Sequence, residues 1–146
     1  MKIEIKIDEN CAEPKVIVVT ARVTEEINEI VRRLSDEPSQ ILAGFKDGQA
    51  AVLKPEHIYR VYAADGKVYA ETKNETYSLR LRLYEAEQRL ANRSFARISN
   101  GELINLKKVK NFDLSFVGTI CVSLSNGTVT YVSRRYVSKI KQLLGL

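Results

Sequence analysis

Asp-Gly and Asn-Gly pairs lie between short runs of β-branched and aromatic residues, and they limit what this chain can fold into. Three of them are Asp47-Gly48, Asp65-Gly66 and Asn126-Gly127. These residues tolerate the positive φ angles of two-residue hairpin turns, so each pair predicts an antiparallel hairpin. The predicted strands are residues 41–45, 50–53, 58–63, 67–72, 76–79, 116–124 and 128–132, with further strand structure in 95–105. Short strands at this spacing predict an antiparallel sandwich or a barrel-like assembly.

Three other segments have the apolar spacing of an amphipathic helix, namely residues 24–34, 82–91 and 135–144. The first of them has glutamates in its first turn and Arg32-Arg33 in its last turn, which is the charge arrangement that a helix dipole favours. Helices and strands together predict a mainly β fold with short helices, of the α+β class.

The first 38 residues differ in character from the rest of the chain. Residues 2–7 alternate isoleucine with charged residues, which predicts a half-buried strand. Residues 15–20 are mostly β-branched, and they predict either a second strand or the lead into the first helix. We therefore expect a strand-helix extension at residues 1–38 and a main domain at residues 39–146.

Charge is divided unevenly along the sequence. Residues 1–56 carry 8 Lys and Arg against 11 Asp and Glu, whereas residues 57–146 carry 15 against 7. A basic surface on a compact domain is suited to polyanions, because Lys and Arg that contact phosphates release bound counterions. Charge alone fits a solvated basic face equally well.

The chain has few of the groups that catalysis needs. His57 is the only histidine and has no acid at a motif spacing, so a structural role is predicted for it. Cys11 and Cys121 lack metal-ligand spacing and are predicted to be buried, reduced thiols. No apolar run is long enough for a membrane helix, and residues 1–10 do not resemble a signal peptide. The sequence predicts a cytoplasmic protein that is not an enzyme and uses no cofactor, metal or small-molecule substrate.

Three turn-rich sites carry side chains that are able to contact nucleic acid. They are Lys67 after its Asp-Gly turn, the group Arg97, Ser99 and Asn100, and the pair Arg134 and Arg135. Asn can bond adenine edges, Arg can bond guanine or phosphate, and Ser and Lys can hold phosphates. The residue types therefore make all three sites candidates for DNA contact.

Two of these sites also have a plainer explanation. Arg97 would form an ion pair at a strand edge, and Asn100-Gly101 would be a turn that needs left-handed residues. Residues 133–135 would be a helix N-cap followed by exposed arginines. Two cations in a first helical turn oppose the helix dipole, however, which favours an anionic partner for Arg134 and Arg135.

Two longer sequence segments surround the second and third of these sites. Residues 95–109 run Phe95-x-Arg97-Ile98-Ser99-Asn100-Gly101-Glu102-Leu103-Ile104-Asn105-Leu106-x-x-Val109, and residues 126–136 run Asn126-Gly127-x-x-x-x-Val132-Ser133-Arg134-Arg135-Tyr136. This order resembles the LytTR DNA-binding domain of bacterial transcriptional regulators, over roughly residues 40–146. One departure is that Ser99-Asn100-Gly101 stands where the family often has His-Arg-Ser.

The resemblance implies an elongated antiparallel β-sandwich whose loops enter successive major grooves of DNA without a helix-turn-helix. It assigns base contact to Ser99 and Asn100, to Arg134 and Arg135, and to Lys67 in an earlier hairpin. Residues 1–38 are too short for the receiver domain that many members carry. The chain is therefore similar to the stand-alone LytTR regulators, which have a small N-terminal extension and are often encoded beside a small membrane protein.

Taken together, these features predict a sequence-specific transcriptional regulator that binds paired short repeats of double-stranded DNA. The acidic extension favours a homodimer or contact with a partner, and the resemblance adds a small membrane protein as a candidate partner. Dimeric binding to two repeats would raise the affinity through effective concentration. The alternative function is a regulatory protein-interaction module whose basic face binds an acidic partner.

Overall fold

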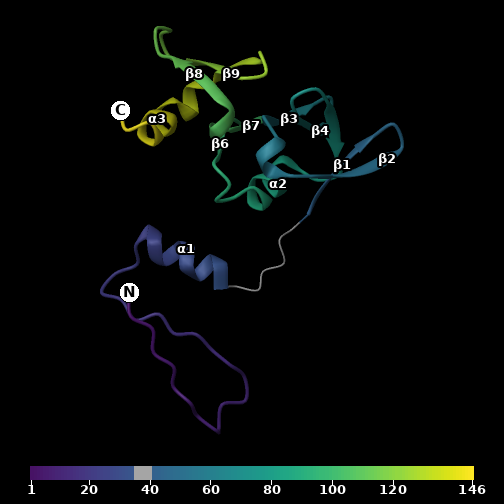
Figure 1. The fold of residues 1–146 in the computed structure, drawn as a ribbon. Helices are drawn as coiled ribbons and strands as arrows, with labels where there is room; N and C mark the ends of the chain where they lie inside the picture. Colours follow the sequence, from purple (N-terminus) through teal and green to yellow (C-terminus); the bar gives the residue numbers. More distant parts are fainter. Residues whose placement is uncertain (35–40) are drawn as a thin grey trace. The chain divides into compact units, whose positions relative to one another are not determined.

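The computed structural model of the protein describes residues 1–34 and 41–146. The chain divides into two units, Met1–Pro38 and Ser39–Leu146. The predicted boundary at residue 38 lies outside the described residues. Figure 1 draws the described part of the first unit in purple and blue, and the second from blue through green to yellow.

Helix α1 (Glu25–Leu34) is the regular element of the first unit, as the sequence predicts. It begins after Thr24, whose hydroxyl oxygen accepts a hydrogen bond of 3.4 Å from the Ile27 amide. The predicted strand at residues 2–7 is wrong, because residues 1–23 contain no strand. A strand needs a partner strand and a surface to cover, and the isoleucines of residues 2–7 remain 82–90% exposed.

The second unit consists of two antiparallel sheets and two α-helices among its described residues. A seven-stranded sheet has the order β2-β1-β5-β4-β3-β7-β6, and a three-stranded sheet has the order β10-β9-β8. The strands of the larger sheet are β1 (Leu42–Lys46), β2 (Gln49–Leu53), β3 (Arg60–Ala64), β4 (Lys67–Glu71), β5 (Thr76–Leu79), β6 (Phe95–Ser99) and β7 (Glu102–Asn105). The smaller sheet contains β8 (Val109–Asp113), β9 (Ile120–Leu124) and β10 (Val129–Val132). The helices are α2 (Leu83–Arg89) and α3 (Arg134–Leu143), and short 3-10 turns lie at Pro55–His57 and Leu106–Lys108.

The predicted hairpins form. Asp47 and Gly48 have φ angles of 50° and 75°, and Asp65 and Gly66 have φ angles of 53° and 75°, so both Asp-Gly pairs supply the left-handed residues of their turns. Strand β8 is not predicted by the sequence pattern, and the strand predicted at residues 116–124 begins only at Ile120.

Two apolar cores lie against the larger sheet. The first contains Leu42, Leu53, Ile58, Val61, Val68, Ala70, Leu79, Leu83, Ala86, Leu90 and Leu103. The second contains Tyr59, Ala96, Ile98, Ile104, Ile120, Val122, Leu124, Val132 and Ile140. Strand β7 separates them, because Leu103 belongs to the first core and its neighbour Ile104 to the second, as alternation along a strand requires. Helix α2 covers the first core, and α3 and the smaller sheet cover the second (Figure 1).

A polar network joins the two sheets. Arg60 donates hydrogen bonds to Glu71, at 2.7 Å, and to Glu102, at 3.1 Å. The hydroxyl of Thr128 donates to Glu71 at 3.0 Å, and the hydroxyl of Thr130 on β10 donates to Glu102 at 2.6 Å. Burial lowers the pKa of the Arg60 guanidinium, but hydrogen bonds and charge attraction from Glu102 and Glu71 outweigh it, so its pKa is raised.

The two cysteines correct one prediction. Cys11 is exposed and Cys121 is half-buried, and neither forms a disulfide. Residues 1–23 have no core that could bury Cys11. Cys121 alternates with the buried Ile120 and Val122, so it faces the more open side of the smaller sheet.

Candidate nucleic-acid interface

The turns of the β3–β4 and β6–β7 hairpins lie at one end of the larger sheet. Strand β3 pairs antiparallel with β7, with Tyr62 opposite Glu102. One step further along, the Ala63 amide donates a hydrogen bond of 2.8 Å to the Gly101 carbonyl. The turn that precedes Lys67 and the turn at Asn100 are therefore neighbours, although the two residues are far apart in sequence.

The start of helix α3 is attached to the same end. The Ser133 amide donates a hydrogen bond of 2.8 Å to the carbonyl of Ile98, which lies at the irregularity in β6 pairing between Arg97 and Ser99. In the first turn of α3, the Tyr136 hydroxyl donates a hydrogen bond of 3.2 Å to Oδ1 of Asn100. The structure thus brings all three predicted sites to one end of the second unit.

Arg97 donates hydrogen bonds to backbone carbonyls of the β6–β7 turn. Its Nε donates to the Ser99 carbonyl at 2.8 Å, and its Nη2 donates to the Asn100 carbonyl at 2.5 Å. Arg97 also forms the ion pair that the sequence analysis gives as its structural role, since its Nη1 lies 3.4 Å from a carboxylate oxygen of Glu87 on α2. The Arg97 guanidinium is therefore occupied by protein groups, and it holds the turn that carries Asn100.

The β6–β7 turn contains no left-handed residue at Asn100 or Gly101, because neither has a positive φ. The prediction that this pair is present to supply left-handed turn residues is therefore wrong. The Ser99 hydroxyl oxygen accepts a hydrogen bond of 3.2 Å from the Gly101 amide, which closes the turn locally. Asn100 is exposed at the tip, and its side-chain NH2 group points to no protein acceptor among the described residues.

Arg134 and Arg135 are the first two residues of α3, and both side chains are exposed. No acidic residue lies in the first turn, and the Ser133 side chain makes no capping hydrogen bond. Within residues 1–34 and 41–146, neither arginine forms an ion pair. Two unpaired cations thus add to the positive end of the helix dipole, and this end of α3 attracts anions.

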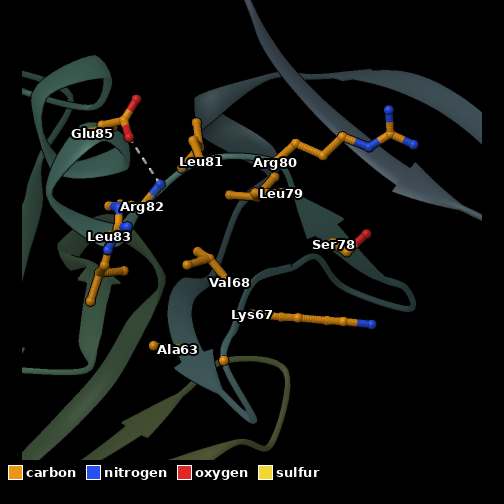
Figure 2. A pocket seen from close by; sticks show the side chains of 11 residues that line it. Ala63, Lys67, Val68, Ser78, Leu79, Arg80, Leu81, Arg82, Leu83 and Glu85 are labelled. Atoms are coloured by element: carbon orange, nitrogen blue, oxygen red, sulfur yellow. Dashed lines mark hydrogen bonds between the residues drawn. The ribbon is translucent and has the colours of Figure 1, made fainter.

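A basic groove of about 830 Å³ lies beside Lys67 (Figure 2). It runs between β4 and the segment from the end of β5 to the start of α2, and Lys67, Arg80 and Arg82 line it. In Figure 2 the side chains of Lys67, at the start of β4, and of Arg80, just after β5, extend in the same direction. Arg80 also lies over the Phe45 ring, 4.0 Å from its centroid, which positions the guanidinium.

Sequence reasoning missed Arg80 and Arg82 as candidate DNA contacts. The signal that was available is the Arg-x-Arg spacing at the start of a predicted helix. Pairing of β4 with β5, with Val68 opposite Leu79, brings both arginines to the Lys67 end of the sheet. The groove is open and has basic side chains, which suits a phosphate backbone better than a small enclosed ligand.

Other classes of site are not evident in the part of the chain that the structure describes. No group of three or more His, Cys, Asp and Glu side chains there could hold a metal ion. No helix there has the length and apolar character to cross a membrane. His57 is exposed in the 3-10 turn Pro55–His57.

Comparison with known proteins finds relatives that match most of this chain. The chain is 29% identical over its whole length to an uncharacterized HTH-type transcriptional regulator of Staphylococcus aureus strain COL, with 99% of that relative covered. The corresponding protein of strain MRSA252 is 28% identical with the same coverage. A solved LytTr DNA-binding domain from Bacillus cereus shares the fold, with a TM-score of 0.69 and 24% identity over 73% of this chain and 97% of that domain.

The names of these relatives refer to a helix-turn-helix (HTH) motif. The described residues of this chain contain no such motif, because strands separate α1, α2 and α3 from one another. The sequence profile described as the LytTr DNA-binding domain matches residues 48–145, which include the strands from β2 to β10 and helices α2 and α3. The chain therefore belongs to the LytTR family of DNA-binding domains.

Proposed function

We propose that this protein is a sequence-specific transcriptional regulator that inserts loop side chains into the major groove of double-stranded DNA. One observation supports this most strongly. Two backbone hydrogen bonds, from Ala63 to Gly101 and from Ser133 to Ile98, gather three sequence-distant polar sites at one end of the second unit. Family membership and the unpaired arginines of α3 point to the same partner.

The side chains divide into base-contacting and positioning groups. Asn100, exposed at the tip of its turn, is proposed to bond a base edge, and Arg134 and Arg135 to bond guanine or phosphate. Ser99 and Lys67 are proposed to hold phosphates at either side. Arg97 is proposed to act through the turn carbonyls that it holds, because its guanidinium is already bonded.

We further propose that two copies bind paired short repeats and that the first unit joins them. Helix α1 has no buried residue, and its apolar side chains Ile27, Ile30 and Leu34 recur on one face. A second copy of the same helix would cover such a face. The small membrane protein suggested by the family resemblance is the other candidate to cover this face of α1. We propose a cytoplasmic location for the protein, and a cytoplasmic protein could bind such a membrane partner through its first unit.

The proposed function is that of a binding protein with no catalytic step. The first experiment is selection of bound fragments from a random double-stranded DNA pool at near-physiological salt, with the wild type and with Arg134→Ala, Arg135→Ala and the double variant. Arg93→Ala is the matched control, because Arg93 is an exposed arginine near the other end of β6. We expect the wild type and the control to enrich paired short repeats and the double variant to enrich none.

An unenriched pool with folded wild-type protein would contradict the proposal. It would favour the regulatory protein-interaction module, in which the same basic face binds an acidic partner. Binding to heparin as tight as binding to the selected DNA would lead to the same conclusion, because heparin offers charge without base edges.

A further inference from the structure

The loop between β8 and β9 carries an apolar tip that no part of the proposed function uses. Its residues 114–119 are Leu-Ser-Phe-Val-Gly-Thr and contain no charge. Val117 is 99% exposed, and Leu114 and Phe116 are about half exposed, at 46% and 47%. An apolar cluster of this kind on a basic domain indicates a contact surface more readily than a solvated loop.

The loop has a defined conformation. The Ser115 amide and hydroxyl both donate to Oδ1 of Asp113, at 2.9 and 2.6 Å. The Phe116 ring meets the ring of Tyr131 on β10 edge to face, with centroids 6.2 Å apart. At the other side, the Thr119 hydroxyl donates a hydrogen bond of 2.6 Å to the Val132 carbonyl. Interactions at both ends therefore hold Val117 outward.

The loop also adjoins the start of α3. Gly118 has a φ of 76°, and a Cβ atom added to it would lie 3.3 Å from Nε of Arg134. The Arg134 side chain thus lies across the backbone next to Val117. Because Ser133 and Tyr136 connect this end of α3 to Ile98 and Asn100, the loop is continuous with the proposed DNA interface.

We propose that Val117 contacts the 5-methyl group of a thymine in the major groove, next to the position that Arg134 occupies. This proposal rests on the proposed function. The thymine methyl is the apolar group that B-DNA presents in its major groove, and short apolar side chains are its usual partners. An uncharged tip beside unpaired arginines fits a base edge, whereas a contact to phosphate alone would call for a cation or a hydrogen-bond donor.

The test replaces single thymines of the selected DNA by deoxyuridine, which removes only the methyl group. Binding to each duplex is measured by fluorescence anisotropy for the wild type, Val117→Ala and Val129→Ala. Val129 is the matched control, because it is an exposed valine at the far end of β10 from α3. Both substitutions lie on the surface, and circular dichroism checks that the variants are folded.

We expect one or two uracil positions to weaken wild-type binding about fourfold, the factor that corresponds to burying one methyl group. Val117→Ala should lose this sensitivity, and Val129→Ala should keep it. If Val117→Ala still loses affinity when thymine is replaced by deoxyuridine, the proposed contact is wrong. It is also wrong if no replacement weakens wild-type binding at any position. Neither outcome contradicts DNA binding itself. Failure of the wild type to enrich any DNA overturns the proposed function and this contact together.

Discussion

The Tyr136 hydroxyl donates its hydrogen bond to Oδ1 of Asn100 across 3.2 Å, and so the first turn of α3 orients the amide at the tip of the β6–β7 hairpin. The two residues lie 36 positions apart in sequence. Oδ1 keeps a second lone pair, and the NH2 group stays free, so the amide can still bond an adenine edge. Tyr136 is thus a positioning residue for the proposed base contact.

Replacing Tyr136 by Phe removes only this hydroxyl. We expect the affinity for selected DNA to fall about three- to tenfold, because the Asn100 amide loses its orientation. The free energy of unfolding should change by less than about 1 kcal/mol, since the bond is exposed. Anisotropy titrations and urea unfolding measure the two quantities. Equal affinity of Tyr136→Phe and wild type would remove Tyr136 from the interface.

The arginines of α3 should determine part of the salt dependence of binding. If Arg134 and Arg135 each neutralise one phosphate, replacing either by alanine should make the slope of log affinity against log salt concentration shallower by about 1. Arg93→Ala should keep the wild-type slope. A slope that stays unchanged in both α3 variants would show that these arginines bind bases alone or no DNA at all.

The network that joins the two sheets should contribute strongly to stability. Glu102→Ala leaves Arg60 with one carboxylate fewer and Thr130 without its acceptor, so we expect a loss of about 2 to 4 kcal/mol in the free energy of unfolding. Glu75→Ala, which breaks the more exposed pair with Lys46, should cost less than about 1 kcal/mol. Urea unfolding of both variants compares the buried and the surface pair, and equal losses would contradict this ranking.

The same network sets an expectation for pH. Because its carboxylate partners raise the Arg60 pKa above its unfolded value, the guanidinium stabilises the fold fully below that unfolded value. This stabilisation is lost only as the pH rises through the raised pKa, in strong alkali. The stability difference between wild type and Glu102→Ala should therefore not decline between neutral and mildly alkaline pH, and unfolding curves over that interval test it.

Ser115 should control the ionisation of Asp113. Hydrogen bonds from the Ser115 hydroxyl and amide lower the pKa of the Asp113 carboxyl. The ordering of the loop by these bonds is present above the ordinary carboxyl pKa, and it is lost as the pH falls through the lowered value. In Ser115→Ala the pKa should move up toward the ordinary value. An NMR titration of the Asp113 carboxyl measures it, and an identical pKa in the variant would contradict the assignment.

Helix α1 should determine the oligomeric state. Ile27→Glu together with Ile30→Glu places two charges on the apolar face, and burying them at an interface would be unfavourable. Sedimentation should show a dimeric wild type and a monomeric variant, while Val16→Glu, an exposed site outside the helix, should leave the dimer intact. A monomeric wild type would exclude self-association through this face and direct attention to the membrane-protein partner.

Local signals in the sequence predict much of this fold. The Asp47-Gly48 and Asp65-Gly66 turns and helix α1 depend on residues close together in the chain, and the structure has all of them. Strand β8 is missed because its pairing with β9 shifts between Val109 and Asn111. The extra residue at such an irregularity breaks the alternation of apolar and polar side chains by which a strand is recognised.

The remaining differences depend on distant partners. The isoleucines of residues 2–7 have the strand pattern but lack a neighbouring strand, so the pattern alone misleads. The residue types at Lys67, Asn100 and Arg134 are visible in the sequence, and so is their capacity to bond DNA. Arg80 joins Lys67 only through the register of β4 and β5, and sequence order does not reveal that register.

The hydrogen bonds that assemble the proposed interface, from Ala63 to Gly101 and from Ser133 to Ile98, both run from amide to carbonyl. Every residue except proline supplies an amide donor and every residue a carbonyl acceptor, so these bonds persist when the side chains around them change. If Asn100 and Val117 contact bases as proposed, single substitutions at these exposed positions would change operator preference. The backbone that positions those side chains would stay the same.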